Sequence, residues 1–322
     1  MADYKGIKGF TIPNVSSDPD NPILGQIWYN STSATLKGEA VGVGSWASGG
    51  NLNTARQWLA GAGIKTAALA MGGEAPVGAQ TESYNGTSWT AVNAINTARG
   101  YLGGFGTLAA AIAAGGSEPG SSALCEQFDG TNWSEVGDLN TARWELSSGV
   151  KGTTSAGIVF AGNGNQAITE QWNGTGWTEV GDLNTGRTRP GGAGTESAAL
   201  VYGGSTPSMT ATTESWNGTS WTEVNDLNTA RQGGSTGGGP ATSALYASGY
   251  TGAGSVKTES WNGTSWTEVA DVATARNGVL GTGASNASGI IAGGETQPGS
   301  ARSDVTEEWT LPDTTTVTVT TS

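Results

Sequence analysis

One stretch of this chain decides the fold, because near-copies of it recur along most of the sequence. Residues 213–231 read Thr-Glu-Ser-Trp-Asn-Gly-Thr-Ser-Trp-Thr-Glu-Val-Asn-Asp-Leu-Asn-Thr-Ala-Arg. The final Arg returns with successive spacings of 43, 44, 44, 44 and 45 residues, at Arg56, Arg99, Arg143, Arg187, Arg231 and Arg276. A period in the forties is typical of rings of small sheets and of stacked helical repeats.

The composition of the repeats favours strands over helices. The chain has 54 Gly among 322 residues, and its repeats are rich in Thr, Ser and Asn without an apolar stripe at helical spacing. Each period holds four short apolar or aromatic segments separated by turn residues. Asn-Gly joins the third segment to the fourth, or Asp129-Gly130 in the second repeat, and these residues suit a tight hairpin turn. Because Asp carries no N-linked glycan, we interpret these positions as turns and not as glycosylation sites.

Two series of aromatic residues are offset by one repeat, which predicts how the chain ends meet. The third segment carries Tyr84, Phe128, Trp172, Trp216, Trp261 and Trp309, and the fourth carries Trp46, Trp89, Trp133, Trp177, Trp221 and Trp266. Trp46 has no third segment before it, and Trp309 has no fourth segment after it. We therefore predict an all-β, six-bladed propeller of four-stranded antiparallel blades, in which residues 45–52 supply the last strand of the last blade.

Small residues at the end of the second segment strengthen this prediction. They occur as Gly72/Gly73, Gly115/Gly116, Gly203/Gly204 and Gly293/Gly294. Together with the aromatic of the third segment and the Trp of the fourth, they make residues 45–311 resemble the kelch-repeat propellers. Two repeats depart from the pattern, with Ala161/Gly162/Asn163 and Ala247/Ser248/Gly249.

The repeated aromatic residues invite two interpretations. Rows of Trp can stack on sugar rings, but a buried Trp also removes about 150–250 Å² from water, and one per repeat suits packing between blades. We predict a packing role for Trp46, Trp89, Trp133, Trp177, Trp221, Trp266, Trp309 and the other third-segment aromatics. Trp58 and Trp144 fall outside this register and are candidate binding contacts.

The repeated Arg residues have an equal number of potential partners. One Glu stands in the third segment of every repeat, at Glu82, Glu126, Glu170, Glu214, Glu259 and Glu307. Paired Arg and carboxylate groups suit fixed, partly buried sites. We predict six structural ion pairs, and the alternative is a ring of Arg side chains that binds an anion.

One face of the propeller is expected to vary more than the other. The connections between the second and third segments are residues 74–80, 117–123, 164–168, 205–211, 250–256 and 295–303, and they differ in length and sequence. Binding sites are commonly built on varied loops of a rigid scaffold. We therefore predict binding at this face, unless the loops vary only for lack of constraint.

The chemistry that the sequence lacks limits its activity. With no His, the chain lacks the commonest general base and metal ligand. Copper oxidases on kelch-type propellers need a Cys beside a Tyr, whereas Cys125 lies between Leu124 and Glu126. Sialidase boxes also have a different spacing from the Asn-Gly motif here. We expect no enzyme activity, no catalytic residues, no cofactor and no metal site.

Charge and hydropathy bear on partners. A formal charge of −13 disfavours nucleic-acid and anionic membrane surfaces, and no apolar run approaches membrane-spanning length. Residues 1–10 lack the apolar core of a secretory signal, although a composition rich in Thr, Ser, Asn, Gly and Trp is typical of extracellular β proteins. A virion protein released by lysis fits both observations.

The two ends of the chain differ from the repeats. We predict an N-terminal arm over residues 1–44, with Pro13, Pro19 and Pro22 and a hairpin over 25–37 that resembles one in bacteriophage tail-fibre proteins. Residues 312–322 alternate Thr and Val and form a tail that could be an edge strand.

These features predict a non-enzymatic structural or attachment protein of a bacteriophage virion. Its two ends would bind other virion proteins within a homo-oligomer or larger assembly, and its varied loops would face a cell-surface glycan or receptor. The alternatives are a lectin-like propeller on or secreted from a bacterium, and an intracellular interaction module of kelch type.

Overall fold

The chain folds as two compact units in the computed structural model, which describes residues 12–20, 25–117, 119–235, 238–297, 301–312 and 314–319. The larger unit is Ser45–Thr310, and the smaller one combines residues 1–44 with 311–322. The polar stretch 1–10 and Pro22 lie outside the described residues. Every regular element that the structure describes is a β-strand, so the all-β prediction is confirmed.

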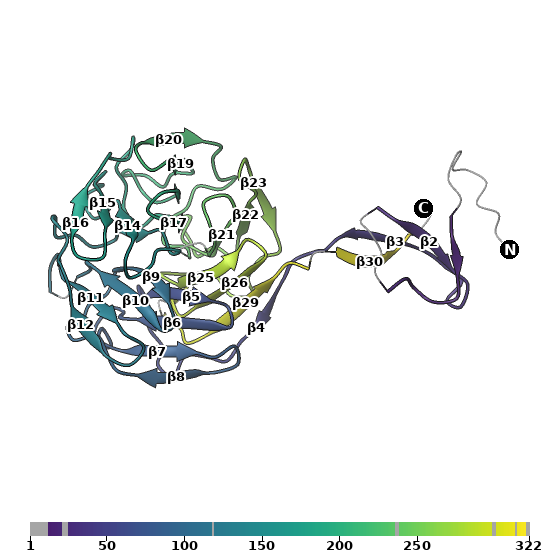
Figure 1. The fold of residues 1–322 in the computed structure, drawn as a ribbon, viewed down its shortest axis with the longest axis horizontal. Coiled ribbons are helices and arrows are strands. Elements are labelled where there is room, and N and C mark those ends of the chain that lie inside the picture. Colours follow the sequence, from purple (N-terminus) through teal and green to yellow (C-terminus); the bar gives the residue numbers. More distant parts are fainter. Residues whose placement is uncertain are drawn as a thin grey trace. The chain divides into compact units, whose positions relative to one another are not determined.

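Each repeat of the larger unit folds into one antiparallel sheet, with strands in chain order. The first sheet contains β5 (Ala60–Ile64), β6 (Ala67–Met71), β7 (Thr81–Tyr84) and β8 (Trp89–Val92). The next three sheets contain β9 (Gly103–Thr107), β10 (Ala110–Ala114), β11 (Cys125–Phe128) and β12 (Trp133–Glu135); β13 (Ser147–Ser148), β14 (Gly157–Phe160), β15 (Thr169–Trp172) and β16 (Trp177–Glu179); and β17 (Gly191–Gly194), β18 (Ala199–Tyr202), β19 (Thr213–Trp216) and β20 (Trp221–Val224). Figure 1 shows these sheets around a common centre.

The last repeat sheet joins two distant parts of the chain. It contains β25 (Leu280–Ser285), β26 (Ser288–Ala292), β29 (Thr306–Thr310) and β4 (Ser45–Ser48). β4 runs antiparallel to β29 and places Trp46 directly opposite Trp309, with ring centroids 5.4 Å apart. The strand from the start of the repeat region therefore lies where the offset of the aromatic series predicts it. It ends at Ser48, four residues before the predicted end at Leu52.

The number of sheets differs from the six expected. Eight sheets occur in the described residues, of which two lie outside the repeat pattern. One is a small sheet of β24 (Arg276–Asn277), β27 (Glu295–Thr296) and β28 (Ala301–Arg302), because the connection 295–303 is long enough to fold into its own hairpin. The fifth repeat has three described strands instead of four, namely β21 (Ala244–Ala247), β22 (Thr258–Trp261) and β23 (Trp266–Val269).

The core of the larger unit lies between neighbouring sheets. Leu69 and Met71 of β6 pack in one cluster with Phe128 and Trp133 of the second sheet. Likewise, Tyr84 of the first sheet shares a cluster with residues of β25 and β26. The inner strands are buried on both faces, which explains their continuous runs of Ala, Gly and aliphatic residues.

The turns with Asn-Gly are four-residue loops whose Asn and Gly have different roles. Gly86 has a φ of 90°, whereas Asn85 accepts hydrogen bonds at its Oδ1 from the N–H groups of Thr87 and Ser88, both at 2.9 Å. Asp129 accepts the same pair of bonds in the second repeat, at 2.8 and 2.7 Å. An acceptor oxygen is all that the first position needs, which explains why Asp replaces Asn there.

The smaller unit is a separate sheet in the order β1 (Asn14–Val15), β2 (Ile27–Asn30), β3 (Thr35–Val41) and β30 (Thr314–Thr318). The predicted hairpin is β2 with β3, and the Thr-rich tail joins it as an edge strand. Asp18 fixes this sheet, because its carboxylate accepts hydrogen bonds from Lys37 Nζ at 2.6 Å and from the buried Trp28 Nε1 at 2.9 Å. These bonds, with that from Lys37 as the largest cause, lower the pKa of Asp18 to about 2.

The pairing of β4 with β29 can be tested by Trp309→Ala. Trp309 is fully buried, donates its Nε1–H to the carbonyl of Asn286 and packs on Trp46. Removing a buried Trp side chain costs about 3–5 kcal/mol. We expect that loss in the free energy of unfolding, measured by urea denaturation, while Thr178→Ala at an exposed position of β16 changes it by less than about 0.5 kcal/mol. Equal unfolding midpoints for the two variants would contradict the assigned packing.

Candidate functional site

Each repeated Arg forms an ion pair with the Glu in the third segment of the repeat that follows it. The pairs are Arg56–Glu82, Arg99–Glu126, Arg143–Glu170, Arg187–Glu214, Arg231–Glu259 and Arg276–Glu307. No side chain in the six pairs is more than 3% exposed. The guanidinium groups therefore have internal carboxylate partners, which argues against the alternative of an anion-binding ring.

The ion pairs also fix the connections between sheets. Arg56 donates from Nη1 to the carbonyl of Gln80 at 2.6 Å and to that of Gly72 at 3.2 Å. Glu82 accepts two hydrogen bonds of 2.7 Å at Oε2, from the backbone N–H and the side-chain amide of Asn53. Burial lowers the pKa of Arg56 to about 10, and the charge of Glu82 opposes that shift.

The small-residue pairs have one backbone conformation in all six repeats. Their first member has a φ of 63–69°, at Gly72, Gly115, Ala161, Gly203, Ser248 and Gly293. The backbone N–H of their second member donates to the carbonyl of the Arg that begins the next repeat, as from Gly73 to Arg99 and from Gly294 to Arg56. The two repeats that have Ala161 and Ser248 in place of Gly therefore keep the same positive φ as the other four.

A further position, two residues after each repeated Arg, lies at the centre of the repeat sheets. It holds Trp58, Tyr101, Glu145, Arg189, Gly233 and Gly278, which we call the axial ring, and every member has a φ between 52° and 63°. Each backbone N–H donates to the carbonyl of the preceding member, and Trp58 donates to Gly278, with distances of 2.7–3.0 Å. The hydrogen bonds thus form an unbroken cycle. Five different residue types at six positions hide this feature in the sequence, and only the fixed offset from Arg could have revealed it.

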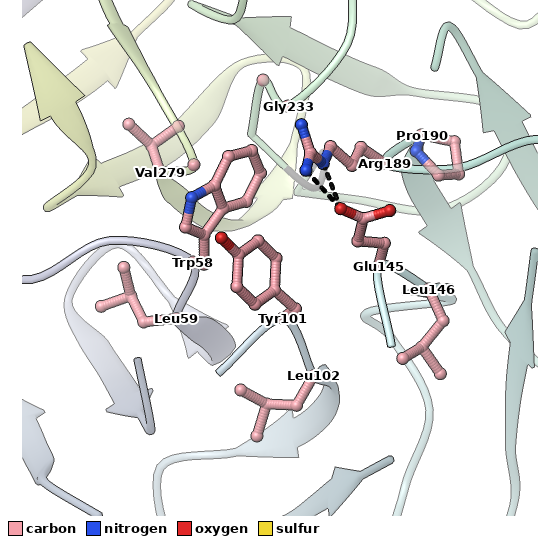
Figure 2. A pocket seen from close by; sticks show the side chains of 12 residues that line it. Trp58, Leu59, Tyr101, Leu102, Glu145, Leu146, Arg189, Pro190, Gly233 and Val279 are labelled. Carbon is pink, nitrogen blue, oxygen red and sulfur yellow. Dashed lines mark hydrogen bonds and ion pairs between the residues drawn. The ribbon is translucent and has the colours of Figure 1, made fainter. Parts of the chain in front are cut away.

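The side chains of the axial ring pack against one another (Figure 2). Trp58 and Tyr101 stack with centroids 4.8 Å apart, and the guanidinium of Arg189 lies 4.8 Å from the centroid of Trp58. Arg189 Nε also donates to Glu145 Oε1 at 2.6 Å. Trp144 meets the edge of Tyr101 at 5.1 Å, so both candidate contacts, Trp58 and Trp144, lie in this cluster.

The two glycines of the axial ring provide the space that Trp58 occupies. A Cβ on Gly278 would lie 2.8 Å from the indole, and one on Gly233 would lie 2.9 Å from it. Trp58 is half-buried and packs against these glycines as well as against Tyr101.

A cavity of about 330 Å³, the axial pocket, lies against the axial ring. Glu74, Tyr250 and Glu295 reach it from three of the varied connections. Gln57, Gln232 and Asn277 line it from the position directly after a repeated Arg, and Trp58, Tyr101 and Arg189 complete it. A smaller cavity of about 50 Å³ shares these last three residues. The varied face predicted from sequence thus contains a pocket.

The polar groups of the axial pocket are suited to binding. Tyr101 donates its hydroxyl to Glu74 Oε1 at 3.2 Å, and Gln57 Nε2 donates to Glu74 Oε2. Burial, and then the charge of Glu74, raise the pKa of Tyr101, so its hydroxyl stays a donor. Burial also raises the pKa of the Cys125 thiol to about 12, which makes it a poor nucleophile.

The described ranges of the chain contain no group of three or more His, Cys, Asp or Glu side chains placed to hold a metal ion. No helix within them is long and apolar enough to cross a bilayer.

The buried ion pairs can be tested by Glu170→Gln. This change leaves the Arg143 guanidinium buried without a counter-charge, so we expect the free energy of unfolding to fall by about 3–5 kcal/mol. Glu179→Gln is a matched control, because Glu179 lies opposite Glu170 on the neighbouring strand and is exposed. Denaturant titrations of both variants give the comparison, and similar losses would show that charge alone, not the buried pair, is responsible.

The axial ring can be tested by Gly278→Ala. The new Cβ meets the Trp58 indole and stands on a backbone with φ of 62°, so we expect a loss of about 2–4 kcal/mol in unfolding free energy. Adding Trp58→Ala removes the steric conflict and should make the effect of Gly278→Ala smaller in a double-mutant cycle. Strict additivity of the two substitutions would contradict the contact.

Comparison with known proteins supports the architecture. No protein-family profile and no curated protein matches this sequence. Among solved structures, one titled "Structure of YjhT" superposes with a TM-score of 0.67 and 14% sequence identity, over 83% of this chain and 99% of that chain. At this identity the likeness concerns the fold alone. Together with the antiparallel repeat sheets, it shows that the chain has a β-propeller fold.

Proposed function

We propose that the larger unit is a six-bladed propeller of kelch type, closed by β4 on β29. The support is the cycle of hydrogen bonds through the axial ring, which has one member from each of six repeats. The shared cluster of Tyr84 with Leu280 and Ile290 supports contact between the first and last repeat sheets. In this view the small sheet of β24, β27 and β28 is an elaboration of the last blade.

We further propose that this propeller is a non-enzymatic attachment domain that binds a glycan in the axial pocket. One observation carries the proposal: the repeated Arg, Glu and Trp are engaged in packing, whereas residues that vary between repeats converge on one pocket. Aromatic rings combined with hydrogen-bonding groups suit a sugar. No His is present, and Tyr101 is held as a protonated donor, which favours binding over catalysis.

We place this domain on a bacteriophage particle, with the smaller unit binding other virion proteins. The hairpin of residues 25–37 and the composition of the chain favour this setting. In the described residues, no strand pairs with the second edge of β30, which leaves backbone groups for a strand of a partner. A lectin-like protein of a bacterial surface is the second candidate, since the axial pocket would serve it equally well.

Two measurements test this function. Mass spectrometry of purified phage particles should detect the chain, and a glycan array probed with the full chain should give signals that Glu74→Gln weakens and Glu179→Gln leaves unchanged. Detection on bacterial surfaces instead of particles would favour the lectin candidate. An array without signal for any bacterial glycan would overturn glycan attachment.

A further inference from the structure

The axial pocket contains buried acceptors that lack donors. Asn277 is 8% exposed, and its Oδ1 has no hydrogen-bond partner within the described part of the chain. The same holds there for Oε1 of Gln57, whose Nε2 is already used by Glu74. Buried acceptors are normally satisfied, so these two oxygens leave uncompensated partial negative charge in the pocket wall, which favours a hydrogen-bond donor or a cation as the ligand.

The charges around the pocket also favour a donor, and specifically a cation. Glu74 and Glu295 line it, and no ion pair engages Glu295 in the ranges that the structure describes. Arg189 is paired with Glu145, so its charge is compensated. Arg302 also contacts a lining carboxylate, with Nη2 3.8 Å from Glu74 Oε2, and donates a hydrogen bond to the carbonyl of Ala75. The two lining carboxylates therefore exceed the available positive charge.

The aromatic lining suits the same ligand. Tyr101, Tyr250 and Trp58 line the cavity, and aromatic rings attract both ammonium groups and the C–H faces of sugars. A volume of about 330 Å³ lies at the lower end of the range for small-ligand pockets, which suits a single sugar ring.

We infer that the axial pocket selects an amino sugar with a free ammonium group. This inference rests on the proposed glycan-binding function and names its ligand class. The ammonium lies between Glu74 and Glu295, and the unsatisfied oxygens of Asn277 and Gln57 add to the negative potential that it meets. Acidic sugars are disfavoured, because their carboxylates would face the pocket's own carboxylates and acceptors.

Calorimetric titration of the full chain with three related monosaccharides tests the inference. We expect glucosamine to bind roughly tenfold more tightly than N-acetylglucosamine, which has no charge on its nitrogen, and glucuronic acid to bind most weakly. Glu295→Gln should weaken glucosamine binding roughly tenfold and leave N-acetylglucosamine binding unchanged. Glu179→Gln, which removes the same charge from an exposed strand, should change neither.

The outcomes separate this inference from the function on which it rests. Equal or tighter binding of N-acetylglucosamine or glucuronic acid would overturn the ammonium preference while glycan binding stands. The ammonium preference is also overturned if glucosamine binding is insensitive to Glu295→Gln, or if no monosaccharide binds although the array gives signals. Only a silent array overturns the function itself. Unchanged unfolding midpoints and tryptophan fluorescence confirm that each variant is folded.

Discussion

The buried pair of Arg and Glu is the interaction on which the rest of this protein depends. An isolated guanidinium in a protein interior is unfavourable, so each Arg requires its Glu and its carbonyl acceptors in fixed positions. Arg56, for example, bonds to Glu82 and to the carbonyls of Gly72 and Gln80, which holds a connection against the sheet that follows. Six such pairs hold the connections between sheets in place, and each axial-ring residue follows its Arg by two positions in such a connection.

The sequence predicted most of this framework because its signals are repeated. The aromatic offset located β4 beside β29, and equal numbers of Arg and Glu indicated the pairs. The repeats did not reveal that Ala161 and Ser248 keep a positive φ, because the identity of a side chain does not report the hydrogen bond that imposes the backbone conformation. The hairpin within 295–303 was missed for a related reason, since it occurs once and has no second copy for comparison.

The candidate site was harder to predict because it is built from positions that differ between repeats. Trp58 and Trp144 stood out as aromatic residues outside the register, but their partners Tyr101 and Arg189 had no such signal. Trp58, Tyr101 and Arg189 share a place in the axial ring, which depends on the closed cycle of hydrogen bonds and not on residue type. The repeated positions thus supply rigidity, while the same backbone framework lets four unlike side chains, those of Trp58, Tyr101, Glu145 and Arg189, meet beside two glycines.

The pairing of Ser45 with Thr310 has a mechanical consequence. The chain enters β4 at Ser45 and leaves β29 after Thr310. Both connections to the smaller unit therefore lie at the same end of this antiparallel pair. Tension transmitted through these links pulls β4 and β29 in one direction, so it neither slides nor peels one strand from the other. The load is shared by two strands and passes into the whole sheet, which is consistent with the attachment role proposed above.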